Sequence, residues 1–416
     1  MTSSRSRLCF MALACSTSTD DDDIRASNFP MNPSAALRCS AAAGYRERSA
    51  SRKSRKDGSA VRYLQFGITI YDPARATPGF TLIVPNFRNE AYLIGMRGEV
   101  LHQWTNLPLR PGNYAYLLKN GNLLWAGRTA EGCPLQAGKG GLLREYDWDG
   151  NVLWEYRDDN QHHDFRRCET GNTLYLGWEA MRPEAAARVR GGQPGTEHKG
   201  RMYGDYVREI DASGTTVWEW HAQDDLDIER YPLNPLVHRD EFAHANACCP
   251  LPNGDVMLSF RRLSTIMIID RHTRKPRWEQ RDDSWGMQHD CEMLANGNIT
   301  WFANGHNTGQ NPFSRVIELD PGTRQTVWEY QGNPPWTFFS PHISGAQRLA
   351  SGHTLICEGQ WGRVFEVTPE GEIVWEYINP HHGEQRPGVF ANWVFRAYRY
   401  AADSQEIRGR LGSLGA

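Results

Sequence analysis

The sequence lacks two features that would point to nucleic acid or a membrane, namely an excess of basic residues and a long apolar run. Its 416 residues carry 46 Lys and Arg against 49 Asp and Glu, which gives a formal net charge of −3. A nucleic-acid-binding domain is expected to present clustered positive charge. A membrane helix needs roughly 20 consecutive apolar residues. We therefore predict no nucleic-acid partner and no membrane span.

Cysteine motifs are missing as well. The 9 cysteines are an odd number, none follows CxxC spacing, and Cys248 and Cys249 are adjacent. Disulfide-rich secreted domains carry an even set of cysteines at regular spacing. The observed pattern is typical of free thiols in a reducing compartment, which favours a cytoplasmic location.

The N-terminal part differs from the rest of the chain, because Ser, Arg and Ala dominate it together with an acidic run from Asp20 to Asp23. The segment LCFMALAC has the apolar character of a signal or lipoprotein peptide. It is only about eight residues long, and no clean cleavage pattern follows it. We expect residues 1–75 to form a disordered or targeting extension and residues 401–416 to form a C-terminal tail.

What the sequence has in abundance is an internal repeat. Each copy ends in a turn and a strand with tryptophan, as in GEVLHQW, GNVLWEY, GTTVWEW, TRKPRWEQ, RQTVWEY and GEIVWEY. The tryptophans recur every 47 to 64 residues, and they are Trp104, Trp154, Trp218, Trp278, Trp328 and Trp375. Because side chains alternate between the faces of a strand, each copy supplies one half-buried strand whose tryptophan points to the core.

A second hairpin precedes each of these strands, as in YAYLLKNGNLLWAGR and CEMLANGNITWFANG. Asn-Gly between alternating apolar residues is a strong hairpin signal. The two hairpins give about four strands per repeat, which is the content of a propeller blade. The first copy, at TLIVPNF, lacks its leading strands, and the C-terminal NWVFRAYRY lacks a tail. We therefore predict an all-β fold, a six-bladed β-propeller over residues 76–400 that is closed by strands from both ends of the chain.

Histidines recur at equivalent places in four repeats, within QHHD, FAHAN, MQHD and SPHIS. They are His162, His163, His244, His289 and His342. The first strand of each blade lines the central channel, so four blades direct imidazoles at one region. A single histidine of this kind is more often a core or loop residue, but four at equivalent places predict a functional cluster. One residue of strand register decides whether His162 or His163 enters the channel.

Neighbouring acidic residues and two insertions complete the pattern. Asp164 and Asp290 directly follow histidines, and neighbours on a strand point to opposite faces. We expect these carboxylates to brace an adjacent blade instead of orienting their own imidazoles. Insertions occupy residues 182–202 and 224–242. The second leads into His244 and is expected to consist of short helical pieces at most and to cap the channel mouth.

The segments HISGAQRLASGHTLICEG, RVFEVTPEGEIVWEYINP, QHDCEMLANGN and FAHAN, the last followed by Arg262, resemble the arylsulfotransferase family. This is the bacterial family that works without 3′-phosphoadenylyl sulfate and is built on a six-bladed propeller. The resemblance covers roughly residues 80–400. It implies an enzyme that moves a sulfuryl group from an aryl sulfate to a phenolic acceptor through a channel histidine. It also implies a small aromatic or anionic substrate and no cofactor, and it makes export an alternative to the cytoplasmic location.

Matched motif by motif, the resemblance makes His289 the nucleophile and His244 and Asn246 the H-x-N pair beside the sulfuryl group. The catalytic set it implies is His289, His244, Arg262, His163 and Asn246. Further substrate contacts are expected from His342, His162 and Arg261.

The chemistry explains these residue types. Sulfuryl transfer resembles phosphoryl transfer, in which charge is held on the equatorial oxygens between attacking and leaving atoms. A neutral imidazole supplies the attacking atom, and an arginine grips the oxygens through its planar fork. A protonated histidine helps a phenolate, whose free pKa is near 10, to leave. Strand alternation lets only one of the adjacent Arg261 and Arg262 face the channel, and the pattern favours Arg262.

Two other functions fit the same residues. Several imidazoles around a propeller axis are suited to a divalent transition metal, with His163, His244, His289 and His342 as alternative ligands. Such a site would serve a metal-dependent lyase, hydrolase or oxidase. The further alternative is a propeller that binds a partner without catalysis, since one fold hosts many functions.

Overall fold

The structure is a computed structural model that describes residues 65–411. The predictions for residues 1–64 and for the last five residues of the C-terminal tail lie outside the described residues. In the described part, no helix has the length and apolar character of a membrane span.

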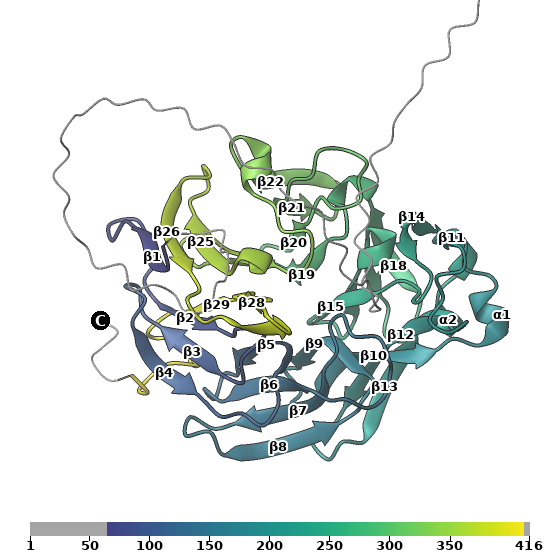
Figure 1. The fold of residues 1–416 in the computed structure, drawn as a ribbon, viewed down its shortest axis with the longest axis horizontal. Coiled ribbons are helices and arrows are strands. Elements are labelled where there is room, and N and C mark those ends of the chain that lie inside the picture. Colours follow the sequence, from purple (N-terminus) through teal and green to yellow (C-terminus); the bar gives the residue numbers. More distant parts are fainter. Residues whose placement is uncertain (1–64, 412–416) are drawn as a thin grey trace, which may run out of the picture. The chain divides into compact units, whose positions relative to one another are not determined.

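Six sheets of antiparallel strands are arranged as the blades of a propeller (Figure 1). Blade 1 contains β29 (Tyr398–Tyr400), β2 (Phe80–Ile83), β3 (Ala91–Ile94) and β4 (Val100–Trp104). Blade 2 contains β5 (Pro111–Leu117), β6 (Leu123–Arg128), β7 (Gly141–Tyr146) and β8 (Val152–Arg157). Blade 3 contains β9 (Gln161–Arg167), β10 (Thr173–Ala180), β12 (Tyr203–Ile210) and β13 (Thr216–His221). The predicted all-β propeller with six blades is confirmed.

The other three blades repeat this pattern, each running from its inner strand outward. Blade 4 contains β15 (Ala245–Pro250), β16 (Val256–Phe260), β17 (Thr265–Ile269) and β18 (Pro276–Arg281). Blade 5 contains β19 (His289–Met293), β20 (Ile299–Ala303), β21 (Arg315–Asp320) and β22 (Gln325–Gln331). Blade 6 contains β23 (Gly345–Arg348), β24 (Thr354–Glu358), β25 (Arg363–Val367) and β26 (Ile373–Ile378), with β1 (Gly67–Tyr71) on its outer edge. Apolar clusters between neighbouring blades form the core.

Both ends of the described chain close the ring. As predicted from NWVFRAYRY, β29 pairs with β2, and Phe80 lies opposite Tyr400. A second closure was not predicted, because β1 pairs with β26 and Gly67 lies opposite Ile378. Strand β1 falls inside the stretch 1–75 that the sequence assigned to the extension. It was missed because GITIY lies outside the repeat that identified the other strands.

The six repeat tryptophans join each blade to the next. Trp104 and Trp375 are buried, and the other four are half-buried. Each indole N–H donates to a backbone carbonyl at 2.8 to 3.0 Å. The acceptors, in chain order, are the carbonyls of Asp147, Ala212, Arg271, Pro321, Pro369 and Met96. Since Met96 belongs to blade 1, the hydrogen bond from Trp375 completes the circle.

A Trp328→Phe variant tests these bonds. It keeps an aromatic ring but removes the N–H that donates to the Pro369 carbonyl at 2.8 Å. We expect the free energy of unfolding to fall by about 1–2 kcal/mol, measured as a lower Tm by thermal denaturation. Trp336 is 64% exposed, so Trp336→Phe is the matched control and should leave Tm almost unchanged. Equal midpoints for the two variants would contradict a bracing role for the indoles.

The two insertions form short elements beside blades 3 and 4. The first contributes α1 (Pro183–Ala186) and β11 (Gly191–Gln193). The second, with the residues just before it, contributes α2 (Ala222–Asp225), η1 (Ile228–Arg230) and β14 (Leu233–His238). β11 and β14 pair in parallel. The short helical pieces expected of the second insertion are present, and a strand accompanies them.

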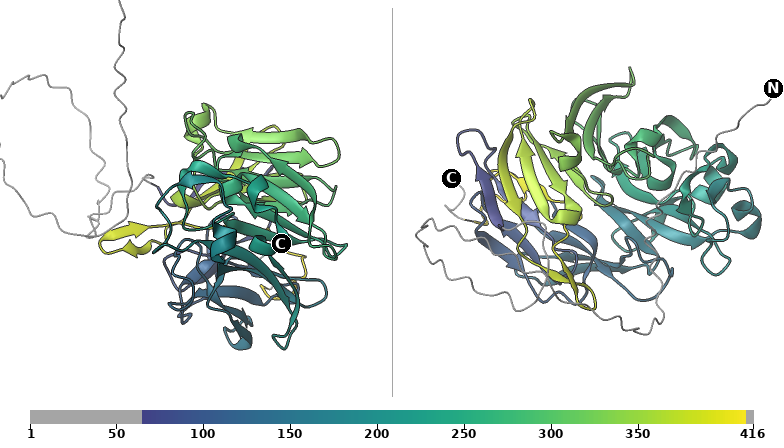
Figure 2. Two further views of the ribbon diagram at one scale, coloured as in Figure 1. Left: turned by 90° about the vertical axis from the view of Figure 1, so that its right-hand side faces the viewer. Right: turned by 45° about the horizontal axis from the view of Figure 1, so that its top comes forward.

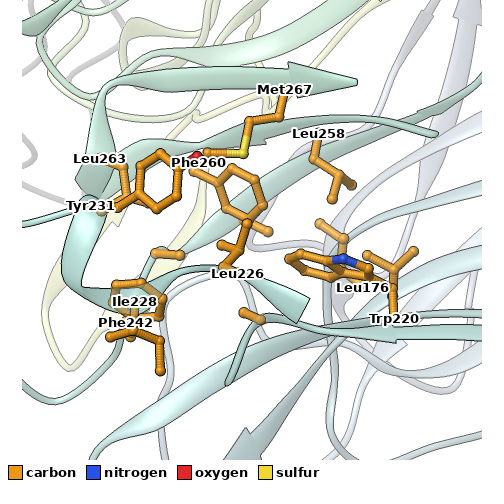
Figure 3. Packing of buried hydrophobic residues seen from close by; sticks show 14 of the residues in the cluster. Leu176, Trp220, Leu226, Ile228, Tyr231, Phe242, Leu258, Phe260, Leu263 and Met267 are labelled. Carbon is orange, nitrogen blue, oxygen red and sulfur yellow. The ribbon is translucent and has the colours of Figure 1, made fainter. Parts of the chain in front are cut away.

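Apolar side chains anchor the second insertion firmly. Figure 3 shows Leu226, Ile228 and Phe242 in the same buried cluster as Trp220 and Phe260 of the neighbouring blades. Each of the three is at most 5% exposed. The segment that leads into His244 is therefore held in place by packing, which fixes where that histidine enters the propeller.

Short turns and one hairpin complete the chain. The 3₁₀ turns are η2 (Arg261–Leu263), η3 (Asp283–Trp285), η4 (Pro335–Thr337) and η5 (Gly359–Trp361). The hairpin of β27 (Gly383–Arg386) and β28 (Val389–Ala391) projects from the propeller, as the yellow strands in the left view of Figure 2 show.

Candidate active site

The four histidine positions share an unusual backbone. His163 and His244 themselves have positive φ, at 48° and 57°, and in the other two blades the residue after the histidine does, with 57° at Asp290 and 53° at Ile343. Residues other than glycine adopt this region rarely and at a cost of roughly 1 kcal/mol or more. The strand pairing is also irregular at the first three positions. The same strained turn thus recurs where the sequence repeats its histidines, and it breaks the simple alternation of side chains.

Three imidazoles are in direct contact. His162 Nδ1 lies 2.8 Å from His163 Nδ1, and His163 Nε2 lies 3.2 Å from His244 Nε2. The ring of His162 is stacked on Trp178 with centroids 4.1 Å apart. His163 therefore faces the histidine of the next blade, while His162 lies behind it. Both were sequence candidates, and the irregular strand lets both point inward.

Carboxylates flank these imidazoles at both ends. His162 Nε2 lies 3.3 Å from Asp205 Oδ1, and His244 Nδ1 makes a short contact with Glu241 Oε1. Burial lowers the pKa of His163 and of His244 well below the ordinary value of 6.5. These two rings are therefore neutral at physiological pH.

Hydrogen bonds at both ring nitrogens hold His289 in a fixed orientation. Its Nδ1 faces Asn304 Oδ1 at 2.7 Å. The Asn304 amide N–H groups donate to the Ser340 and Ile343 carbonyls, so its oxygen must accept, and the His289 proton sits on Nδ1. Burial lowers the pKa of His289 well below its ordinary value. Its Nε2 then carries a lone pair, with only the Ile343 N–H at 3.3 Å.

His342 borders the same region, together with a sixth histidine, His306. Burial lowers the pKa of His342 to about 4, with further contributions from the charge of Arg261 and from His306. The His342 ring packs against Trp393 at 4.7 Å between centroids. Burial and the charge of Arg261 also lower the pKa of His306. His306 was not predicted, because it follows β20 instead of starting an inner strand.

The two adjacent arginines have different surroundings. They lie in η2 and not on a strand, so strand alternation does not apply to them. Arg261 makes no side-chain hydrogen bond or ion pair to any residue of the described part. Its positive charge lowers the pKa of several site histidines, namely His163, His244, His289, His306 and His342. Burial lowers the pKa of Arg261 itself to about 10.

Arg262, by contrast, is held by acidic partners. Its Nη1 donates to Asp240 Oδ1 at 2.6 Å and to the His238 carbonyl at 2.7 Å. Its Nη2 lies 3.0 Å from Glu241 Oε1, and Glu241 in turn contacts His244. Arg262 therefore touches the site through Glu241, and the charge of Arg261 acts on more of the site histidines than that of Arg262 does.

Asn246 is completely buried beside the nucleophile candidate. Its Nδ2 donates to the Gln288 carbonyl at 2.8 Å, and Gln288 directly precedes His289. Its Oδ1 has no hydrogen-bond partner within residues 65–411. The H-x-N asparagine thus links the strand of His244 to the start of the strand of His289.

The expectation that the acidic neighbours brace adjacent blades is confirmed. Asp164 Oδ2 accepts from the Cys248 N–H at 2.8 Å, and Asp290 Oδ2 accepts from the Ala346 N–H at 3.1 Å. Both partners belong to the next blade. Arg396, which lies just before β29, joins both carboxylates, at 3.2 Å from Asp164 and 2.8 Å from Asp290.

Metal ligation receives no geometric support. Among residues 65–411, no group of three or more His, Cys, Asp or Glu side chains is arranged to hold a metal ion. The four alternative ligands, His163, His244, His289 and His342, do not form such a group. The cysteines of this part, Cys248 and Cys249 included, are free thiols.

A cavity of about 620 Å³ lies between the second insertion and the loop after β20. Gly305 and Asn307, which flank His306, line one side, and Asn234 to Leu236 of the second insertion line another. Asn234 Nδ2 lies 3.4 Å from the Asn307 carbonyl. The insertion therefore borders the loop that carries His306, and its role as a cap of the channel mouth stays a prediction.

Sequence reasoning missed Asp205, Glu241 and Asn304. Glu241 had a weak local signal, since it lies three residues before His244. Asp205 lies in β12, the third strand of blade 3, and Asn304 follows β20, the second strand of blade 5, so neither belongs to a histidine motif of an inner strand. Only the fold brings these two residues to the rings that they contact.

Comparison with known proteins agrees with the resemblance. A family model described as Arylsulfotransferase (ASST) matches residues 117–380, which is more than half of the chain. No curated protein matches the sequence.

Several solved structures are similar in shape. One is a protein of unknown function from Bacteroides caccae, with 12% identity, a TM-score of 0.49, and coverage of 78% of this chain and 99% of its own. Another is a streptogramin B lyase, with 10% identity and a TM-score of 0.42, and the match covers 80% of this chain and 93% of that chain. A third is virginiamycin B lyase from Staphylococcus aureus, with 14% identity and a TM-score of 0.38, and the match covers 64% of this chain and 69% of that chain. At such identities the likenesses say nothing about the reaction.

Proposed function

The chain belongs to the arylsulfotransferase family, and from this premise we propose that it moves a sulfuryl group from an aryl sulfate to a phenolic acceptor through His289. Family membership implies a transferase. The donor, the acceptor and the histidine mechanism are our proposal, and the side chains around His289 support it.

The observation that carries the proposal is the lone guanidinium of Arg261. A partly buried positive charge without an acidic partner is costly, and an anionic ligand removes that cost. The rings around it are neutral, so a sulfate ester would meet one cation and several directed nitrogen atoms. A planar guanidinium matches two sulfuryl oxygens at once. Arg261 is therefore the group that grips the substrate.

His289 supplies the attacking atom. Its Nδ1 proton is held by Asn304, so the lone pair lies on Nε2 and needs no deprotonation. The long hydrogen bond from the Ile343 N–H, at 3.3 Å, gives way when Nε2 attacks. Attack on sulfur displaces the phenolate in line and leaves a sulfuryl group on the ring, which a second phenol then removes. His244 stands opposite, oriented by Glu241, and Arg262 holds Glu241 in place. In this arrangement Arg262 is a positioning residue.

Lysine substitutions at the two arginines separate these roles. Arg261→Lys keeps the charge but loses the fork, so we expect kcat/KM for p-nitrophenyl sulfate to fall about 10- to 100-fold with little change in Tm. Arg262→Lys loses bonds to Asp240 and Glu241, so we expect a lower Tm to accompany any loss of rate.

The matched pair is measured by steady-state kinetics and thermal denaturation. A larger loss of activity in Arg262→Lys than in Arg261→Lys, with an unchanged Tm in Arg262→Lys, would contradict the proposed role of Arg261. Arg262 would then be the residue that binds the sulfuryl oxygens, as the sequence motifs predicted.

A phenol-dependence assay tests the function itself. With p-nitrophenyl sulfate as donor, release of p-nitrophenol should rise with the concentration of an added phenol and show ping-pong kinetics. Failure to release p-nitrophenol at any phenol concentration would contradict the proposed function.

A further inference from the structure

Five side chains form a continuous row of polar contacts behind the candidate site. It runs from Asp205 through His162, His163 and His244 to Glu241. The links are 3.3 Å, 2.8 Å and 3.2 Å, followed by the short contact of His244 Nδ1 with Glu241. Each member is at most 4% exposed. Phe395 packs against both His163 and His289, with ring centroids 6.4 Å and 6.1 Å away, so the middle member of the row and the nucleophile candidate share one aromatic neighbour.

The row needs one more proton than its imidazoles carry. Three of the links are hydrogen bonds, and each needs one proton. In the fourth, the buried and unpartnered His162 Nε2 and Asp205 Oδ1 face each other 3.3 Å apart, which also calls for a proton between them. Three rings with one N–H each supply three protons. We assign the fourth to one of the two carboxyl ends.

Glu241 is not the carboxyl group that carries the fourth proton. It already receives N–H groups from His244, from Arg262 Nη2 at 3.0 Å and from Trp178 Nε1 at 2.9 Å. Three donors, one of them a cation, stabilise a carboxylate and not a carboxylic acid. Glu241 therefore accepts the His244 Nδ1 proton.

Asp205 has the opposite surroundings. Its Oδ2 accepts only the Ala245 N–H at 2.9 Å. Its Oδ1 has no hydrogen-bond partner among the described residues and lies 3.3 Å from His162 Nε2, which has none either. Burial raises the pKa of this carboxyl, and the negative charge of Glu241 adds to the rise, while His162 opposes it. The fourth proton is assigned to Asp205.

We propose that this row is a proton relay, in which Asp205 stores the proton that a leaving phenolate takes and recovers it from the acceptor phenol. The inference rests on the proposed sulfuryl transfer and adds Asp205 and His162 to it. Neither residue touches the reacting atoms. Both act through His163.

The first half-reaction conserves atoms and charge. The N–S bond from His289 Nε2 forms while the S–O bond to the aryl group breaks, and its electron pair stays on the aryl oxygen. That oxygen takes the Nε2 proton of His163. The Nδ1 proton of His162 moves to His163, and the carboxyl proton of Asp205 moves to His162. Every imidazole of the row is neutral again, and Asp205 carries the negative charge.

The second half-reaction runs the row backwards. The acceptor phenol gives its proton to His163 Nε2 as its oxygen attacks the sulfuryl group on His289. The proton shift returns through His162, and Asp205 is protonated once more. One stored proton therefore serves both halves, and no exchange with solvent is needed.

An Asp205→Asn variant blocks the relay with little change in shape. The asparagine oxygen can still accept from the Ala245 N–H, and its amide N–H can still donate to His162, but an amide does not release that proton. We expect the rate with phenyl sulfate to fall about 100-fold more than the rate with p-nitrophenyl sulfate, whose phenolate needs a proton far less. The measurement is kcat for both donors with the full chain.

Asp164→Asn is the matched control. Asp164 is also fully buried, and its Oδ2 also accepts from an N–H of the next blade. Its other partners are Tyr114 and two arginines, with no histidine among them. The ratio of the two rates should stay at the value of the unmodified protein, whatever the effect on Tm.

The outcomes separate the relay from the proposed function. An equal fall with both donors in Asp205→Asn would overturn the relay and leave sulfuryl transfer standing. No p-nitrophenol release by the unmodified protein would overturn both. If Asp205→Asn does not fold, His162→Phe keeps a ring against Trp178 and removes both nitrogens. The same change in ratio is expected of it, and an unchanged ratio would overturn the relay.

Discussion

A His289→Ala protein is expected to lose sulfuryl transfer from p-nitrophenyl sulfate by about 10⁴-fold or more, since the attacking atom is gone. Asn304 keeps its bonds to two backbone carbonyls, so the loop that surrounds the site should stay in place and Tm should change little. The measurement is p-nitrophenol release at saturating donor and phenol, with thermal denaturation beside it.

His244→Ala is the comparison that gives this result its meaning. His244 has similar burial and also touches neighbouring site residues, but its removal leaves the His289 lone pair intact. We expect a smaller loss, about 10²- to 10³-fold. An equal or larger loss in His244→Ala, with activity surviving in His289→Ala, would move the nucleophile to His244.

Truncation of the chain after Ala391 is expected to abolish cooperative folding. The deletion removes β29, which closes blade 1 against β2, and it exposes a strand edge. It also removes Arg396, the closer of two guanidinium groups that join Asp164 and Asp290 inside the ring. Arg166 remains, at 3.4 Å and 3.8 Å from these carboxylates. Loss of one partner from a buried ion-pair network adds up to about 3–5 kcal/mol to the cost of the lost strand, which is a large part of the stability of a typical domain.

The matched control for this prediction ends the chain at Leu411 and keeps every described strand. It should melt in one sharp transition. The shorter chain should show none, as followed by circular dichroism and tryptophan fluorescence. A cooperative transition near the control midpoint in the shorter chain would contradict closure by β29.

The repeat explains why so much of the fold was predictable. Six strands with tryptophan at matched places, and Asn-Gly turns between them, specify blades through local chemistry alone. The indoles also donate to the next blade. This partner lies 41 to 58 residues ahead for blades 2 to 5 and 279 residues back for Trp375. No local pattern in the sequence predicts that bond.

The site was predictable only in part, because the repeated motifs locate some of its residues and the fold alone brings in the others. The pseudo-symmetry of the repeat puts His163, His244 and His289 at one end of the inner strands, and the repeated motifs alone are enough to predict this. Which of Arg261 and Arg262 serves the site could not be predicted from the sequence. Both lie in the turn η2, where the alternation of side chains that holds in a strand does not apply. Asp205 and Asn304 reach the histidines through strand pairing that the histidine motifs do not contain.

The central claim is that His289 carries the sulfuryl group between donor and acceptor. The most direct measurement is the intact mass of the protein after incubation with p-nitrophenyl sulfate without acceptor, followed by mapping of the modified peptide. The account predicts a gain of one sulfuryl group on His289 that disappears when a phenol is added and is absent in His289→Ala. Sulfuryl transfer that proceeds without an adduct, or an adduct that persists in His289→Ala, would contradict it.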